Sequence, residues 1–149
     1  MSVENVCSYN VVTIAPQASV GEAARTMRQH HIGDLVVAER KDGIMKPVGI
    51  VTDRDLVVEV LAQDAPPEKL TVADIMSTDP LFVSTDNGLE YVLGKMHEAG
   101  VRRAPVVDSR GELVAILSID DVIDYVARVT GRIAATIGKQ HGVERERRP

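Results

Sequence analysis

Hydrophobic residues recur at helical spacing in two stretches of the chain, and a constant shift along the sequence superposes one stretch on the other. Both follow the i, i+3, i+4, i+7 pattern of an amphipathic helix. The matching sets are Val20, Ala23, Ala24, Met27 and Ile32, and Leu89, Val92, Leu93, Met96 and Val101. Capping signals precede both stretches, Ser19 with Glu22 and Asn87 with Glu90. We therefore predict two equivalent helices with capped N-termini.

Short aliphatic and β-branched runs, typical of strands, flank each predicted helix. Residues 11–14 and 81–83 precede the helices, and two hairpins follow, with turns at Asp42-Gly43 and around Gly111. A further apolar helical pattern closes each copy. Its residues are Leu56, Val57, Val60 and Leu61 in the first copy, and Val122, Ile123, Val126 and Ala127 in the second. The chain thus reads as two β-α-β-β-α units.

A single unit of this size has too small a core to be stable alone. We therefore predict an α+β protein in which two repeats pack sheet to sheet with pseudo-twofold symmetry. The predicted organisation is repeat 1 at residues 3–62, a linker at 63–71 that contains Pro66-Pro67, repeat 2 at 72–129, and a C-terminal helix and basic tail at 130–149. Ile133, Ala134 and Ile137 share one face of that last helix, which we expect to cover either the core or a dimer seam.

Composition narrows the functional classes. The 149 residues carry a net charge of -5, which opposes binding to nucleic acid or to an anionic membrane surface. The one cysteine, Cys7, has no disulfide partner within the chain, and no apolar run has the length of a membrane span. We therefore expect a cytoplasmic protein. The tail is basic, through Arg132, Lys139, Arg145, Arg147 and Arg148, and we expect it to be solvated and assign it no function.

Candidate chemistry lies where the last strand of each unit meets its last helix. Thr52 precedes Asp55 by three residues, and Ser118 precedes Asp121 in the same way. One interpretation is a capping box, in which each side chain satisfies a backbone N–H of the other residue. The other is a ligand site, because a helix N-terminus suits a phosphate and a carboxylate accepts hydrogen bonds from ribose hydroxyls. The repeat alone does not decide between them.

Three segments resemble the tandem cystathionine β-synthase (CBS) domain pair, in the manner of stand-alone bacterial CBS domain proteins. They are residues 48–56, which look like the family's strand-to-helix signature, residues 72–76, which look like its lead-in to a second repeat, and residues 101–107, which look like its central strand. The resemblance implies a regulatory module that binds AMP, ADP, ATP or S-adenosylmethionine in two clefts, forms a homodimer and signals to a protein partner in trans.

The resemblance also implies roles for individual residues. Asp55 and Asp121 would hold ribose hydroxyls, and Thr52 and Ser118 would lie near the α-phosphate. Aliphatic strand residues would sandwich adenine, namely those near Thr13, Ile14 and Val37 in one copy and Phe82, Val83 and Val106 in the other. Phosphate would meet Arg54, Arg102 and Arg103, each of which is equally well explained as a surface ion pair.

One difference between the copies predicts unequal clefts. Arg54 of the first copy corresponds to Asp120 of the second. A carboxylate in that place would repel a polyphosphate, so we expect the cleft with Thr52 and Asp55 to bind AMP or ATP better than the other. The second cleft would be empty or take a less anionic adenosyl ligand.

The sequence offers little support for an enzyme or a metal site. The histidines have no cysteine partner and no i, i+4 histidine, and the phosphate-binding glycine loops of nucleotide hydrolases are missing. We therefore expect no catalytic residues, no metal and no catalytic cofactor. The alternative to a ligand sensor is a ligand-free structural module for protein interaction, in which Thr52-Asp55 and Ser118-Asp121 are only caps. An enzyme acting on nucleotides is a third class, for which no residues can be named.

Overall fold

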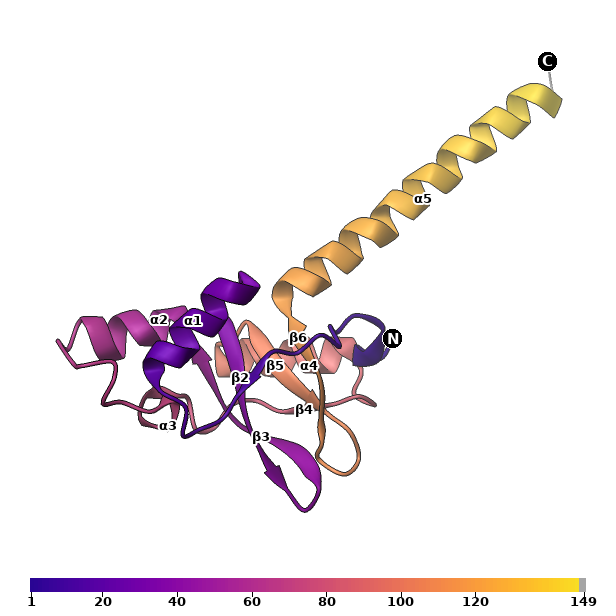
Figure 1. Ribbon diagram of the computed structural model, residues 1–149. Coiled ribbons are helices and arrows are strands. Elements are labelled where there is room, and N and C mark those ends of the chain that lie inside the picture. Colours follow the sequence, from indigo (N-terminus) through magenta and orange to yellow (C-terminus); the bar gives the residue numbers. More distant parts are fainter. Residues whose placement is uncertain (148–149) are drawn as a thin grey trace.

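A computed structural model describes residues 1–147, and it forms the predicted double unit (Figure 1). The first unit contains β1 (Thr13–Ile14), α1 (Val20–His30), β2 (Asp34–Lys41), β3 (Ile44–Thr52), α2 (Asp53–Asp55) and the π-helical segment η2 (Leu56–Leu61). The second contains β4 (Val83–Ser84), α4 (Leu89–Ala99), β5 (Arg103–Val107), β6 (Leu113–Ser118) and α5 (Ile119–Arg147). Two short helical turns, η1 (Val3–Asn5) and α3 (Val72–Ile75), complete the chain. Arg148 of the predicted basic tail lies outside the described residues.

Each unit has one three-stranded sheet of the same topology. β1 pairs in parallel with β2, which pairs antiparallel with β3, and β4, β5 and β6 repeat this order. The registers Thr13 to Val36 and Val83 to Val106 occupy equivalent places in the two sheets. The α+β class and the internal repeat are therefore confirmed. β1 and β4 have two residues each. β1 is shorter than the predicted run 11–14, because Val11 and Val12 lie outside the strand, and β4 begins two residues later than the predicted run 81–83.

The predicted first hairpin turn is confirmed by backbone geometry. Asp42 and Gly43 have φ values of 54° and 82°, the left-handed conformation that a two-residue turn between twisted strands requires. Gly111, in the second hairpin, has φ 79°. Glycine has no Cβ to clash in that region, which is why these positions mark the turns in the sequence.

The two helix caps differ from each other. Ser19 caps α1 as predicted, because its Oγ accepts a hydrogen bond from Glu22 N at 3.1 Å. The cap predicted for Asn87 is wrong. α4 begins after Gly88, and Asn87 Oδ1 instead accepts a hydrogen bond from Ser84 N at 2.9 Å. The side chain therefore closes the turn between β4 and α4 rather than the helix itself.

Each of the short helical turns η1 and α3 packs on the unit that it does not precede in the sequence. Val3 and Val6 lie in the core of the second unit, and Val3 N donates to Asn87 O at 3.0 Å. Conversely, Val72 lies in the core of the first unit, where its N–H donates to Ala18 O at 2.8 Å. Each core is thus closed by a segment that stands next to the other unit in the sequence, and this exchange ties the two units together.

The last helix of each unit buries only part of its predicted apolar face. Val60 and Val122 are buried, whereas Val57, Leu61, Ile123 and Val126 are exposed. α5 then continues as one helix to Arg147 and stands away from the body (Figure 1). Ile133 is 57% exposed and Ile137 is 53% exposed, so this part of α5 does not cover the core of its own chain. Within residues 1–147, no helix is both long and apolar enough to cross a bilayer.

Candidate ligand-binding site

The Thr52 and Asp55 side chains form a complete capping box at the start of α2. Asp55 Oδ2 accepts hydrogen bonds from Thr52 N at 2.7 Å and from Thr52 Oγ1 at 2.9 Å. Asp55 N in turn donates to Thr52 Oγ1 at 3.2 Å. The strand β3 therefore ends and the helix begins at a fixed angle, which holds Thr52 at the junction.

Ser118 and Asp121 repeat this arrangement at the start of α5. Asp121 Oδ2 accepts hydrogen bonds from Ser118 N at 3.1 Å and from Ser118 Oγ at 2.5 Å, and Asp121 N donates to Ser118 Oγ at 3.1 Å. In both boxes the acceptor is Oδ2, and no hydrogen bond found among the described residues uses Oδ1. Capping and ligand binding are therefore compatible, because one carboxylate oxygen of each aspartate stays available.

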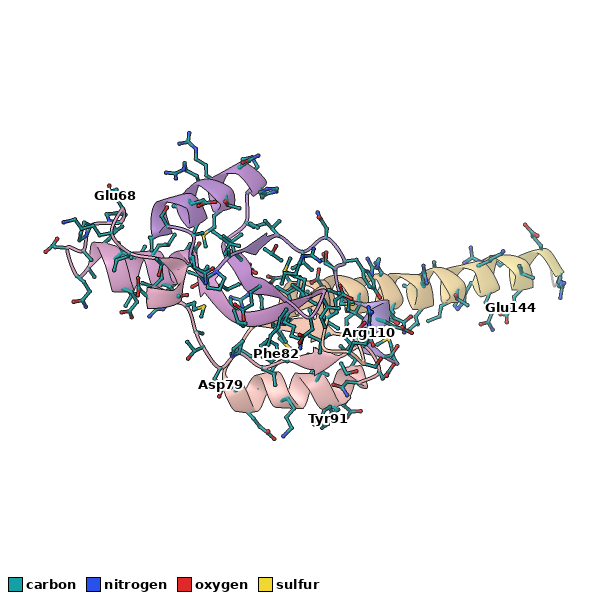
Figure 2. All side chains as sticks on the ribbon, turned by 60° about the horizontal axis from the view of Figure 1, so that its bottom comes forward. Glu68, Asp79, Phe82, Tyr91, Arg110 and Glu144 are labelled. Carbon is teal, nitrogen blue, oxygen red and sulfur yellow. The ribbon has the colours of Figure 1, made fainter. Side chains whose placement is uncertain are left out.

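A cleft with Thr52 in its wall, called the Thr52 cleft below, lies between the two units. Its volume of about 540 Å³ falls in the range of small-molecule sites. Both units supply its walls. The lining residues are Gly33, Ile50, Thr52, Asp53, Arg54, Ser77, Asp79, Pro80, Leu81, Gly100, Val101, Arg102 and Arg103. Asp55 does not line this cleft, although it positions Thr52. In Figure 2, Asp79 and Phe82 project from the segment that leads into β4.

A second cleft, called the Ser118 cleft, is smaller, with a volume of about 210 Å³. It also draws on both units, and here the aspartate of the capping box is part of the wall. The lining residues are Ser8, Asn10, Val11, Val12, His30, Ile32, Asp34, Val36, Arg103, Ile116, Ser118 and Asp121. Each cleft thus combines the helix start of one unit with the apolar lead-in segment of the other.

The aliphatic residues predicted to sandwich adenine need correction. Ile14 and Val37 lie in the core of the first unit, and Val83 and Val106 lie in the core of the second. None of these four side chains lines a cleft, nor does that of Thr13, which is exposed at the start of β1. Successive side chains of a strand point to opposite faces, so in β2 Val37 points into the core while its neighbour Val36 lines the Ser118 cleft. The apolar cleft residues include Val12, Val36 and Ile116 in one cleft and Ile50, Leu81 and Val101 in the other.

Three arginines and two aspartates line the Thr52 cleft. The arginines are Arg54, Arg102 and Arg103, the residues that the sequence analysis expects to face phosphate, and the carboxylates are those of Asp53 and Asp79. Asp120 does not line the Ser118 cleft. Its Oδ1 lies 3.4 Å from an Arg102 guanidinium nitrogen, and its Oδ2 lies 4.0 Å from one of Arg103. Asp120 therefore does not face the second cleft as expected, and it instead offsets charge on the arginines of the Thr52 cleft.

Arg103 is common to both clefts and also connects the units. Its Nε lies 2.7 Å from Oδ1 of Asp34, whose side chain is only 12% exposed. Burial raises the pKa of Asp34 above its ordinary value, Arg103 opposes this rise, and nearby Asp53 adds to it. Desolvation of Asp34 thus outweighs its attraction to the guanidinium, which leaves Arg103 held by a carboxylate that is itself costly to ionise.

One residue of the clefts, Asp34, had no signal in the sequence. It follows the end of α1, and only the fold brings it opposite Arg103 of the second unit. Gly33 did have a usable signal as a glycine between a helix and a strand. A Cβ at Gly33 would lie 2.9 Å from Asp53 Oδ2, and Asp53 N donates to Gly33 O at 2.9 Å. The described part of the chain brings no three metal-ligating side chains together.

Residues 3–62 and 72–128 each match the family model of the CBS domain. The chain belongs to the CBS domain family. The CBS domain-containing protein YhcV of Bacillus subtilis is 32% identical over 121 residues, which make up 81% of this chain and 82% of YhcV. The resemblance to CBS domain proteins inferred from the sequence is therefore confirmed, and the protein is a CBS domain pair, a regulatory module.

Solved structures of CBS proteins have the same fold. The hexameric CBS-CP12 protein from bloom-forming cyanobacteria has a TM-score of 0.73 at 28% identity, and the match covers 99% of this chain and 88% of that one. The CBS domain pair of protein MJ0100 was solved in complex with 5-methylthioadenosine and S-adenosyl-L-methionine. Its TM-score is 0.72 at 27% identity, with 85% of this chain and 99% of that chain covered.

Proposed function

We propose that this CBS pair is a non-enzymatic sensor that binds an adenosine-containing ligand, AMP, ADP, ATP or S-adenosylmethionine, between its two units, with a phosphate-bearing ligand in the Thr52 cleft. The observation that carries the proposal is the combination found in this one cavity of about 540 Å³. It joins a helix start that carries a hydroxyl residue, three arginines and an aliphatic wall. The helix start and the arginines suit the phosphates of a nucleotide, and the aliphatic wall suits its base.

Within this cleft, each residue has a distinct proposed role. Thr52 lies where an α-phosphate would meet the N-terminus of α2. Asp55, which lies outside the cleft wall, holds Thr52 there through the capping box, and we propose that its free Oδ1 reaches the ribose hydroxyls from behind Thr52. Arg54, Arg102 and Arg103 neutralise the phosphates. The base packs against the apolar residues of the wall, Ile50, Leu81 and Val101.

The Ser118 cleft suits a less anionic ligand. Asp34 and Asp121 both line it, and Arg103 is paired with Asp34 there. A polyphosphate would meet one arginine against two carboxylates in this smaller cavity, whereas the Thr52 cleft sets three arginines against Asp53 and Asp79. An adenosyl group without phosphates would meet hydrogen-bond acceptors in the Ser118 cleft. The MJ0100 pair, which was solved with two adenosyl compounds that lack phosphates, supports this assignment. We infer that the two clefts differ in ligand class.

The ligand signal is proposed to pass through self-association. Val57 and Leu61 on η2, and Ile123 and Val126 on α5, expose apolar surface on the helices that follow Thr52 and Ser118. A ligand at those helix starts can change their angle, and with it the geometry of a homodimer and its affinity for a protein partner in trans. The hexameric CBS-CP12 neighbour supports self-association in this fold. We place this activity in the cytoplasm, in line with the net charge and the single cysteine.

A second candidate is a ligand-free module for protein interaction. The two complete capping boxes favour it, because they explain Thr52, Asp55, Ser118 and Asp121 without any ligand.

Thermal unfolding of the full chain with AMP, ADP, ATP, S-adenosylmethionine and NAD separates the two candidates. A ligand at 100 times its Kd adds about 2.7 kcal/mol to the free energy of unfolding, which raises the unfolding midpoint by several degrees. The sensor predicts such a rise with at least one of the first four compounds. An unchanged midpoint with all of them would contradict the sensor and leave the interaction module.

A further inference from the structure

The part of α5 beyond the second unit has no packing partner in its own chain. Both figures show it leaving the body as a single straight helix (Figures 1 and 2). From Gly131 to Arg147, every side chain that the structure describes is exposed. Ile133 and Ile137 are more than half exposed, and Val143 is 36% exposed. Large aliphatic side chains are thus presented to solvent along one helix.

Apolar side chains, with Thr136 and Gln140 as polar exceptions, follow a seven-residue repeat. Spacings of four and three alternate along one stripe, called the α5 stripe below, which begins on the body and runs to the end of the helix. Its members are Val122, Val126, Val129, Ile133, Thr136, Gln140 and Val143. Ile123, Thr130 and Ile137 flank the stripe on one side. A strict period of 3.5 residues is the pattern of two helices that pack along their length.

The composition of this segment also argues that it needs a partner. Gly131 and Gly138 are poor helix formers. A Cβ built at either position meets no atom of the described chain within 4 Å, so no close contact within the chain explains these glycines. A short helix without packing is marginal in water even when its composition is favourable. A helix that continues to Arg147 is therefore best explained by burial of the α5 stripe against another surface.

Charge identifies that surface as a second copy in parallel orientation. In a parallel pair, the residue just before Gln140 lies at the edge of the stripe and faces the residue five places later in the partner helix. Lys139 then faces Glu144 of the second copy, and twofold symmetry forms this pair twice. In an antiparallel pair centred on the same segment, the edge that carries Arg132, Lys139 and Glu146 would face itself. Arg132 would then pair with Glu146 of the second copy, but the two copies of Lys139 would meet, a like-charge contact that the parallel pair does not have.

A polar residue within the stripe supports the same register. Gln140 occupies a stripe position, where a parallel, in-register pair places it against its own copy, so that the two amides can bond to each other. In the single chain its Nε2 donates to Glu144 Oε1 at 3.1 Å. Glu144, labelled in Figure 2, therefore lies beside the stripe, within reach of an approaching lysine.

We infer that the α5 stripe is the interface through which two copies of this chain associate, as a parallel, in-register helix pair. The inference rests on the self-association within the proposed function, and it is independent of the ligand. Burial of Ile133 and Ile137 supplies the affinity, and the Lys139–Glu144 pairs select the orientation.

Sedimentation equilibrium of the full chain tests the interface. The variant Ile133→Asp/Ile137→Asp is compared with Ala135→Asp/His141→Asp, which adds the same two charges to the same helix but away from the stripe and from the residues that flank it. We expect a wild-type dimer, a dissociation constant raised about 100-fold or more by the first variant, and a much smaller change with the second. A wild-type monomer would overturn both the inference and the proposed self-association. A wild-type dimer that Ile133→Asp/Ile137→Asp leaves unchanged would overturn the inference alone.

Disulfide trapping tests the orientation. Under mild oxidant, Val143→Cys should give a covalent dimer, because parallel pairing brings the two copies of position 143 together, whereas His141→Cys on the outer face should not. Wild type, whose one cysteine is the buried Cys7, gives the background. Failure of Val143→Cys to cross-link above that background would overturn the parallel register.

Discussion

Arg103 of the second unit and Asp34 of the first form an ion pair, with Nε and Oδ1 2.7 Å apart. Arg103 also lines both clefts. An anionic ligand in either cleft would therefore compete with Asp34 for the same guanidinium. Because burial already raises the pKa of Asp34, the loss of its partner would favour its protonation. This pair makes the two clefts interdependent.

Replacement of Arg103 should therefore weaken binding of a phosphate-bearing ligand. We expect Arg103→Gln to raise the Kd for the nucleotide that binds best by roughly 10- to 100-fold, the loss of one charged hydrogen bond in a partly buried site. Isothermal titration calorimetry measures this Kd. Arg110→Gln is the control, because Arg110 pairs with Asp108 and Glu112 in the second hairpin, away from both clefts. Wild-type affinity in Arg103→Gln would remove this residue from the site.

Asp120 should act in the opposite direction. It lies close to Arg102 and Arg103 and offsets their charge. We expect Asp120→Asn to tighten ATP binding up to about fivefold at low salt, with the gain fading as salt increases, because these groups are exposed. Asp124→Asn, on the same helix, controls for the change in net charge. Two equivalent nucleotide sites in the wild type, or weaker ATP binding by Asp120→Asn, would contradict the unequal clefts.

The absence of a side chain at Gly49 should allow residues 76–77 to pack closely on β3. A Cβ there would lie 2.6 Å from Met76 Sδ and 2.8 Å from the Ser77 carbonyl oxygen. Gly49→Ala should lower the free energy of unfolding by about 1–3 kcal/mol, a typical cost of overpacking. Gly94→Ala in α4 is the matched control. No atom of the described chain lies within 4 Å of a Cβ at Gly94, so that change should stabilise by up to about 1 kcal/mol. Urea denaturation measures both, and equal effects would contradict the contact.

Low pH should remove the contribution that Asp74 makes to the stability of the fold. Hydrogen bonds from Thr71 N and Oγ1, both 2.8 Å, lower the pKa of Asp74 below its ordinary value of 3.8. A lowered pKa in the folded state stabilises the fold above pH 3.8, and this contribution disappears as the pH falls through the folded-state pKa. The difference in unfolding midpoint between wild type and Asp74→Asn should therefore shrink from pH 6 to pH 3. A constant difference would show that this carboxylate is not held as described.

The repeat was predictable from sequence because local signals agree with the fold. The Asp42-Gly43 turn, the Ser19 cap and the helical spacing around Met27 each depend on neighbours in the chain. The exchange of Val3 and Val72 between units was not predictable, because nothing local distinguishes packing on the adjacent unit from packing on the other.

The clefts were predicted in part. Thr52 and the arginines stand in residues 48–56 and 101–107, which resemble the family's segments, and Ser118 holds the place in the second copy that Thr52 holds in the first. The adenine wall was misplaced because alternation along the strands turns Val37 and Val106 into the cores, and a shift of one residue in a strand reverses the side that a residue faces. Asp34 was missed because its role depends on Arg103, which is far from it in sequence.

The central claim is that the Thr52 cleft binds an adenosyl ligand through groups that are more than a helix cap. The most direct test is calorimetric titration of Asp55→Ala, Asp121→Ala and Asp74→Ala with the ligand that stabilises the wild type. Asp74 belongs to a capping box of the same kind, at the start of α3 and outside both clefts. We predict that Asp55→Ala abolishes nucleotide binding while Asp74→Ala retains it, although both lower the unfolding midpoint. Binding that survives Asp55→Ala but is lost in Asp121→Ala would contradict the account.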